Sequence, residues 1–471
     1  MAASVDQSPH FTERRRGGLL IVKDAPKFDL ESYIANYEGF TRLARLEHIA
    51  RLSPPLAIEA LHLAIPEAKT GKDTRAYLSL VELLHNIDAS DSLALPDLDW
   101  VEKTNQLNDR ETERLEHELR GYKNNLIKES IRMGQEDIAS HFLSMSALEE
   151  SSKAYQKMRE YCTTPKHIAE MTIKLIFVGI SSGQWLSAQS NCHKARALSL
   201  KPEDKERFDP VIYACSGLAY IGQQDYRIAA QAFTSIGPSF TTDSALAGIN
   251  FAKQVLTAND IAVYGGLCAL ASMDRHELQT LVLDNASFRN FLELEPHIRR
   301  AISFFCGGKY SQCLGTLEAY RNDYLLDRYL TAHVETLYQL IRTKSIVQYF
   351  APFSRVTLSA LAEAFPKPGL AVTTPEIAEE ELIMMIENGF LDARIDTVDQ
   401  LLIAPPKDIR ADAHSNALTA AQEIEHLLRL KLHKINMTQA GLEIQPPKGK
   451  GQKGGIGGSM GNYEMAGGMM V

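Results

Sequence analysis

The sequence has little of what catalysis, membrane insertion or nucleic-acid binding usually needs. No apolar run is long enough to cross a bilayer, and the polar N-terminus has no secretory hydrophobic region, so we expect an intracellular protein. The six cysteines form no CxxC pair, which argues against a zinc site and a disulfide framework. A net charge of -9 argues against a general nucleic-acid binder, because such proteins neutralise phosphates with Lys and Arg.

Catalytic motifs are also scarce. Residues 179–183 read GISSG and match the G-x-S-x-G motif of serine hydrolases, with Ser181 as the candidate nucleophile. The match falls where the helical pattern places a turn, and no oxyanion segment accompanies it, so chance is the favoured explanation and a hydrolase the weaker alternative. His276 and His117 each precede a glutamate, but neither is followed by the second histidine of a zinc motif. We predict no catalytic residue, no metal site and no cofactor.

The sequence does contain repeated helical patterns. Residues 1–27 lack periodicity and predict a flexible arm, whereas apolar residues recur at helical spacing from Phe28 onward. Residues 217–233, GLAYIGQQDYRIAAQAF, place small and aromatic residues as a tetratricopeptide-like helix pair does. Weaker copies of this pattern begin at Leu148, Trp185 and Tyr310. The pattern predicts a stack of helical hairpins, an α-solenoid.

Residues 379–396, EEELIMMIENGFLDARID, predict a helix, a turn at Gly389 and a strand. Residues 391–404 alternate as two short strands, and another amphipathic helix follows. This order is typical of a winged helix, a fold that often reads DNA with its last helix. Residues 374–388 contain five glutamates and no Lys or Arg, so phosphates would be repelled and DNA binding is a disfavoured alternative.

Several segments together resemble a known family. They are YGGLCALA at 264–271, FLELEP at 291–296, the stretch from GKY to DRYL at 308–330, and TKSIVQYFAPFSRVTLSALAEAF at 343–365. In this order they resemble the subunit 1 family of the COP9 signalosome, whose members carry a PCI domain, and the likeness spans roughly residues 28–440. The homologous PCI subunit of the proteasome lid is the alternative, since it would share the DRYL segment.

The resemblance implies a mainly α fold: an N-terminal helical-repeat (TPR-like) α-solenoid, then a winged-helix subdomain that completes a PCI domain, and a C-terminal helix. It implies a non-catalytic scaffold in a complex that removes NEDD8 from cullins and so regulates cullin-RING ubiquitin ligases, with the metal site in another subunit. The implied partners are other PCI and MPN subunits and, as candidates, cullin-RING ligases. No nucleic acid and no membrane are expected, and the implied location is the nucleus and cytoplasm.

The corresponding boundaries are a flexible arm at 1–27, a helical-repeat domain at 28–240, the helical part of the PCI domain at 241–342, its winged helix at 343–406, a C-terminal helix at 407–440 and a flexible Gly-rich tail at 441–471. We also expect the N-terminal repeats to face outward, free of the central packing.

The expected subunit interface is the strand after Gly389 together with the C-terminal helix. An edge strand can pair with a strand of another subunit through its backbone. The candidate interface residues are Leu391, Ala393, Ile395, Leu402, Leu427 and Leu430. Some of the strand residues are also candidates for closing the winged helix's own core, because alternate residues of a strand face opposite sides.

Overall fold

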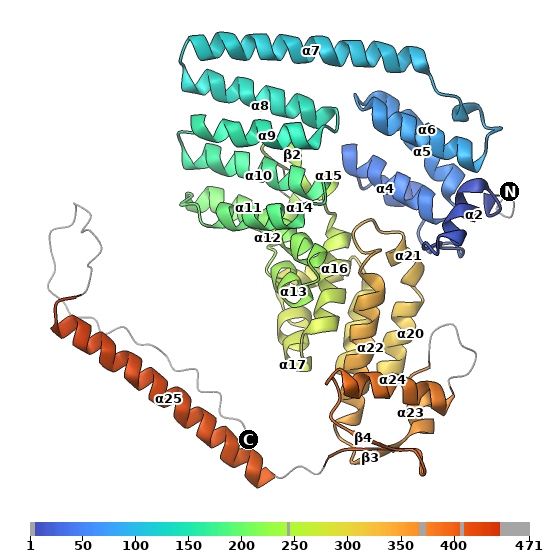
Figure 1. The fold of residues 1–471 in the computed structure, drawn as a ribbon, viewed down its shortest axis with the longest axis vertical. Coiled ribbons are helices and arrows are strands. Elements are labelled where there is room, and N and C mark those ends of the chain that lie inside the picture. Colours follow the sequence, from blue (N-terminus) through green and yellow to red (C-terminus); the bar gives the residue numbers. More distant parts are fainter. Residues whose placement is uncertain (1–4, 243–244, 367–373, 406–408, 443–471) are drawn as a thin grey trace. The chain divides into compact units, whose positions relative to one another are not determined.

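The computed structural model describes residues 5–242, 245–366, 374–405 and 409–442. It divides into a unit ending at Ala404 and a second unit beginning at Pro405, and each is considered by itself. The described chain is mainly helical, which confirms the predicted fold class (Figure 1). None of the described helices is both long enough and apolar enough to span a membrane.

The first helices form a core of their own. They are α2 (Pro9–Arg16), α3 (Leu30–Ile34), α4 (Gly39–Leu52), α5 (Ala57–Thr70) and α6 (Thr74–Ile87), followed by the short η1 (Ser92–Ala94). Phe11 and Val22 are buried in this core. The prediction of a flexible arm at 1–27 is therefore wrong for its described part, because a single buried aromatic anchors a helix too short to show periodicity.

A stack of antiparallel helices follows. Its members are α7 (Leu98–Asn124), α8 (Lys128–Ser144), α9 (Leu148–Met158), η2 (Arg159–Tyr161), α10 (Pro165–Ser181), α11 (Trp185–Arg196), α12 (Pro202–Gly222) and α13 (Tyr226–Thr234). Each long helix packs against the next one along the chain, and Figure 1 shows α7 to α11 lying in layers. This is the predicted helical-hairpin arrangement.

The turns inside the hairpins share one backbone geometry. Ser146, Gly183, Gln224 and Gly308 have φ of 57°, 70°, 65° and 74°, and each lies two residues before a helix. The next amide closes the turn: Gln184 N–H donates to the Gly179 carbonyl at 2.9 Å. This left-handed C-terminal motif satisfies carbonyls that the ending helix leaves free. It explains why the repeated pattern in the sequence begins at these points.

The helical part that follows is centred on α16 (Ala258–Ser272). Around it lie α18 (Ala286–Leu292), α19 (Pro296–Cys306), α20 (Tyr310–Glu318), α21 (Arg321–Leu325) and α22 (Val334–Phe350). Shorter elements connect them: α14 (Ser239–Thr242), β1 (Ala245–Leu246), β2 (Ile249–Asn250), α15 (Phe251–Gln254), α17 (Arg275–Glu277) and a π-helix, η3 (Leu278–Leu283). A Cβ at Gly266 would lie 2.3 Å from Ile298 Cγ2, so only glycine allows α19 to approach α16 this closely.

The winged helix contains β3 (Arg355–Thr357), α23 (Leu358–Ala364), α24 (Pro375–Glu387), β4 (Arg394–Asp396) and β5 (Leu401–Ile403). The strands form an antiparallel sheet in the order β3-β5-β4. Gly389 has φ of 73° and ends α24, as the sequence predicts. In the second unit, α25 (Ile409–Gln439) forms the expected C-terminal helix.

Candidate assembly interface

The winged-helix sheet has β4 at one edge. Ile395 of β4 is opposite Leu402 of β5, and β4 pairs with no second strand among the described residues. One side of its backbone is thus available to another strand, which is how an edge strand extends a sheet across two chains. The strand is only three residues long, so pairing of this kind would be local.

The side chains predicted for this edge mostly serve the protein's own core. Leu391, Ala393 and Leu402 are 5%, 8% and 0% exposed, and Ile395 is partly buried against the same core. The first three therefore cannot present their side chains to another subunit, and this part of the interface prediction is wrong. Alternate residues of an extended chain face opposite sides, and these side chains lie on the side that faces the core. The backbone of β4 therefore remains as the candidate contact with another subunit.

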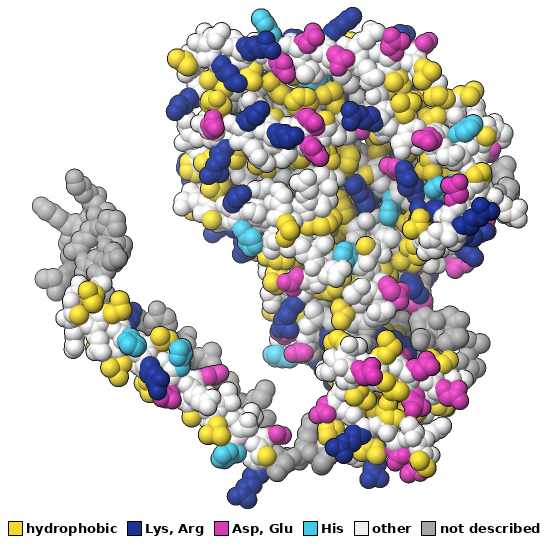
Figure 2. All heavy atoms as spheres, viewed as in Figure 1, with side chains coloured by type: hydrophobic (Ala, Val, Ile, Leu, Met, Phe, Trp, Pro, Cys, Tyr) yellow, Lys and Arg dark blue, Asp and Glu magenta, His cyan; other side chains and the backbone are white. Residues whose placement is uncertain are grey.

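Helix α24 presents an acidic and apolar face. Ala378, Leu382 and Met385 are buried, while Glu376, Glu380 and Glu387 are exposed beside Ile383 and Met384. Figure 2 shows carboxylates interspersed with hydrophobic side chains over this part of the surface. A face without Lys or Arg is unsuited to the phosphates of DNA, whereas its apolar residues suit a protein contact.

Exposed apolar residues on α24 and in the turn after it escaped the sequence reasoning. Met384 is 62% exposed and Phe390 55% exposed, although both occur within the stretch that predicts helix, turn and strand. Met384 directly precedes Met385, which is buried. Because adjacent residues of a helix face different sides, the sequence could have indicated that Met384 points outward.

Helix α25 carries the last two predicted interface residues. It is the one helix among the described residues of its own unit, and Leu427 and Leu430 are 56% and 52% exposed. The side chains of leucines on an isolated helix become buried only when another helix packs against them. The role of Leu427 and Leu430 in subunit contact therefore stays a prediction.

A buried charge cluster was missed by the sequence reasoning altogether. The Arg45 side chain is fully buried and donates through Nη1 to Asp327 at 2.6 Å and through Nη2 to Asp260 at 3.0 Å. Tyr264 also donates to Asp327, at 2.8 Å. Burial raises the pKa of Asp260. At Asp327 burial also acts to raise the pKa, but the Arg45 guanidinium and the hydrogen bonds from Tyr264 and the Leu330 backbone together lower it. The cluster ties α4 to α16 and to the segment after α21.

This contact corrects the expectation that the N-terminal repeats are free of the central packing. The core of the first helices includes Leu326, and Tyr37 donates to Asp260 at 2.8 Å. Both interactions join residues more than two hundred positions apart, a distance over which periodicity carries no information.

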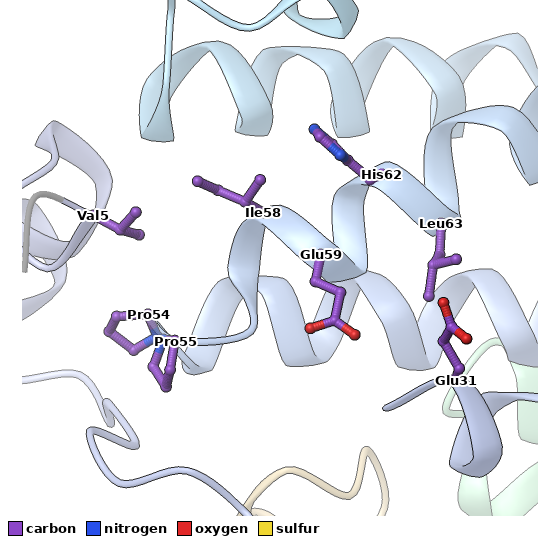
Figure 3. Close-up of a pocket in the computed structure, with 8 residues that line it drawn as sticks. All are labelled: Val5, Glu31, Pro54, Pro55, Ile58, Glu59, His62 and Leu63. Carbon is purple, nitrogen blue, oxygen red and sulfur yellow. The ribbon is translucent and has the colours of Figure 1, made fainter. Parts of the chain in front are cut away.

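A surface groove of about 400 Å³ lies on the N-terminal helices (Figure 3). Figure 3 shows the carboxylates of Glu31 and Glu59 on one side of α5 and Ile58 and His62 on the other. The His62 ring nitrogen Nε2 is 2.6 Å from Asp91. The groove is therefore acidic and apolar, with its histidine already held by a carboxylate.

The motif with Ser181 is not a catalytic site. Ser181 is the last residue of α10, its side chain is 7% exposed, and the residues before it are helical where a nucleophile elbow needs a strand. Within the described part of the chain, no three His, Cys, Asp or Glu side chains gather as a metal site would require. The cysteines are free thiols, and burial raises the pKa of Cys192, to about 12.

Comparison with known proteins identifies the family. A family model described as 26S proteasome subunit RPN7 matches residues 97–281, and a PCI domain model matches residues 317–406. The COP9 signalosome complex subunit 1 of Emericella nidulans is 49% identical over 433 residues, which cover 91% of this chain and 85% of that protein. The chain belongs to the COP9 signalosome complex subunit 1 family.

Further relatives support this assignment. The subunit 1 proteins of Neurospora crassa and Arabidopsis thaliana are 38% and 36% identical over 89% and 87% of this chain, covering 92% and 89% of their own lengths. The 26S proteasome non-ATPase regulatory subunit 6 of Oryza sativa is only 22% identical, over 63% of this chain and 74% of its own length. The prediction of a signalosome subunit is thus confirmed over the proteasome-lid alternative, and subunit 1 membership with a PCI domain indicates a non-catalytic scaffold.

In the structure, the YGGLCALA stretch that carries the resemblance is buried throughout. Tyr264 reaches the buried charge cluster, Gly265 and Gly266 allow close helix contacts, and the remaining residues are buried on all sides of α16. Every position of the stretch is therefore constrained by packing, because a helix buried all round has no tolerant face.

Proposed function

We propose that this chain is a scaffold subunit of a COP9 signalosome, a complex that removes NEDD8 from cullins and thereby regulates cullin-RING ubiquitin ligases. The observation that carries the proposal is the similarity to subunit 1 proteins over most of the chain, together with a PCI domain that presents an open sheet edge. The catalytic metal then belongs to another subunit of the complex.

The direct partners are other PCI and MPN subunits. Among the described residues, strand β4 has an unpaired backbone edge, and the exposed Met384 and Phe390 supply apolar area on the same subdomain. Backbone pairing fixes the register between two chains, while burial of apolar area provides most of the free energy of association. The winged helix would thus join a row of similar subdomains through its edge.

Helix α25 provides a second attachment. Its exposed Leu427 and Leu430 are suited to a bundle with the C-terminal helices of other subunits. Cullin-RING ligases are proposed as further partners, in contact with the N-terminal helices, and the chain is proposed to act in both nucleus and cytoplasm. Cell fractionation in which the chain is absent from one of these compartments would contradict the last point.

Purification from the native cell tests the scaffold role. A set of PCI and MPN partners should accompany the tagged chain, and recovery as a lone monomer would contradict the proposal. Deletion of the gene should cause NEDD8-modified cullins to accumulate. Accumulation of polyubiquitinated proteins with normal deneddylation would instead favour a role in the proteasome lid.

Two substitutions test the C-terminal helix. Leu427→Asp with Leu430→Asp places charge on the apolar positions, and we expect the variant to lose partner subunits without a change in its own melting temperature. Gln422→Asp adds one negative charge elsewhere on the same helix and is the control. Retention of all partners by the double variant would exclude these leucines from the interface.

Proline substitutions test the sheet edge. Arg394→Pro and Ile395→Pro each remove one backbone N–H from β4, and successive N–H groups of a strand point to opposite sides. One variant should therefore lose partner subunits while its melting temperature stays near that of the wild type, and the other should weaken the chain's own sheet. Normal assembly of both variants would refute strand pairing at this edge.

A further inference from the structure

A cavity of about 230 Å³ lies where residues 27–37 meet α16, α19 and α21. Tyrosine rings and carboxyl groups share its lining, and we call it the tyrosine cavity. The lining residues that matter here are Tyr33, Tyr37, Tyr320, Tyr324, Glu295 and Asp323. It is formed by this chain alone, so its chemistry does not depend on the proposed assembly.

Two carboxylates in this cavity form no close ion pair with a described Lys or Arg, although the Lys27 ammonium attracts Asp323 and partly offsets the effect of burial on its pKa. Glu295 accepts a hydrogen bond from Asn259 Nδ2 at 2.6 Å, and Asp323 accepts one from the backbone N–H of Lys27 at 2.9 Å. Neither forms an ion pair with a Lys or Arg anywhere in the described ranges. Burial raises the pKa of both groups, so a cation placed between them would recover the stabilisation that water supplies to exposed carboxylates.

Of the neighbouring basic groups, Lys27 is charged and lies on one wall of the cavity, whereas Arg45 is engaged elsewhere and His297 is neutral. Arg45 is held by Asp260 and Asp327. The His297 ring is 3.3 Å from Glu295, but burial lowers its pKa to about 4, so it carries no charge at neutral pH. The cavity therefore has a surplus of negative charge within aromatic walls.

One wall of the cavity already holds an ammonium group. The Lys27 side-chain nitrogen Nζ lies 4.0 Å from the centre of the Tyr320 ring, and that ring is stacked on His297 with centroids 3.9 Å apart. A cation over an aromatic face is attracted by the ring's negative centre. Lys27 is exposed and belongs to the segment before α3. Its contact shows that the Tyr320 wall accommodates an ammonium group.

We propose that the tyrosine cavity binds a primary alkylammonium group, with Glu295 and Asp323 as its counter-ions and Tyr320 as its aromatic wall. The group is that of a lysine side chain on a bound protein or of a free diamine, and Lys27 competes for the same wall. A bare metal ion is a poorer match, because aromatic rings do not replace its oxygen ligands. The alkyl chain of an amine instead gains from contact with the rings.

Titration calorimetry of the full chain with cadaverine at pH 7.5 tests this site. We expect saturable binding at one site, no comparable binding of 1-pentanol, and a gain of several-fold in affinity in Lys27→Ala, which removes the competing ammonium. The double variant Glu295→Gln with Asp323→Asn should bind about tenfold or more weakly, as for the loss of a charge-assisted contact. Glu59→Gln makes the same change in the separate groove of Figure 3 and should bind as the wild type.

Several results would overturn the proposal. These are binding of 1-pentanol as strong as that of cadaverine, unchanged binding in the double variant, or no binding in either the wild type or Lys27→Ala. If the double variant fails to fold by its melting curve, Glu295→Gln and Tyr320→Leu singly carry the test, each with an expected loss. A short acetylated peptide containing one lysine distinguishes the sources: binding comparable to cadaverine supports a protein lysine, and binding of cadaverine alone supports a free diamine.

Discussion

Replacement of Arg45 by leucine should break the contact between the N-terminal helices and the rest of the first unit. The guanidinium is fully buried and donates to Asp327, Asp260, Tyr33 and Tyr264. Leucine removes the positive charge but leaves both carboxylates in place. Two buried like charges would then face each other without a counter-ion.

The expected cost follows from that burial. Removal of one partner from a buried ion pair typically costs about 3–5 kcal/mol, because the remaining charge stays desolvated. In Arg45→Leu, Asp327 still accepts hydrogen bonds from the backbone N–H groups of Tyr329 and Leu330, at 2.9 and 3.0 Å. Because these bonds stabilise its charge, we expect the loss of unfolding free energy to be near the lower value, about 3 kcal/mol. A loss of this size is a large fraction of the stability of a typical domain.

Urea denaturation followed by circular dichroism measures the loss, with Arg51→Leu as the matched control. Arg51 is on the same helix and pairs with Glu47, but its side chain is 41% exposed. An exposed pair of this kind contributes about 0–1 kcal/mol. Limited proteolysis should also degrade the N-terminal helices faster in Arg45→Leu than in the control, because these helices open more often.

The loss should depend on pH. Without Arg45, the folded-state pKa of each buried aspartate lies above its unfolded value, so the folded state binds protons more tightly. Stability then falls as pH rises from the unfolded pKa through the folded pKa, and the deficit of Arg45→Leu should be larger at pH 8 than at pH 5. A deficit no greater than that of Arg51→Leu, at either pH, would refute the assigned role of the cluster.

Two further predictions concern packing and thiol burial. Gly266→Ala should destabilise the fold by about 1–3 kcal/mol in thermal melts, because its Cβ would meet Ile298. Gly315→Ala is the control: its Cβ would meet nothing within 4 Å, and in a helix alanine should be neutral or stabilise by up to about 1 kcal/mol. N-ethylmaleimide at pH 8 should leave Cys215 unmodified until the protein is denatured, since burial raises its pKa, whereas the partly exposed Cys162 should react more readily; equal rates in the native protein would contradict the assigned burial.

The candidate interface shows where pattern reasoning succeeds and where it fails. Alternation over 391–404 predicted two strands correctly, and Gly389 predicted the turn before them. The same alternation cannot say which face is inward, and Leu391, Ala393 and Leu402 proved to be core residues. An apolar strand residue has the same identity whether it packs against its own chain or a partner's, so only the folded structure separates the two.

The sequence by itself determined the local features of this protein. Helical periodicity, the turn residues and the acidic helix at 375–387 are encoded within a few residues, because they depend on backbone sterics and on the neighbouring side chains. The tertiary structure alone decided the burial of Arg45 and the position of Lys27 over Tyr320. Arg45 meets Asp260 and Asp327 across 215 and 282 residues, and contacts between such distant residues arise only when packing brings the helices together.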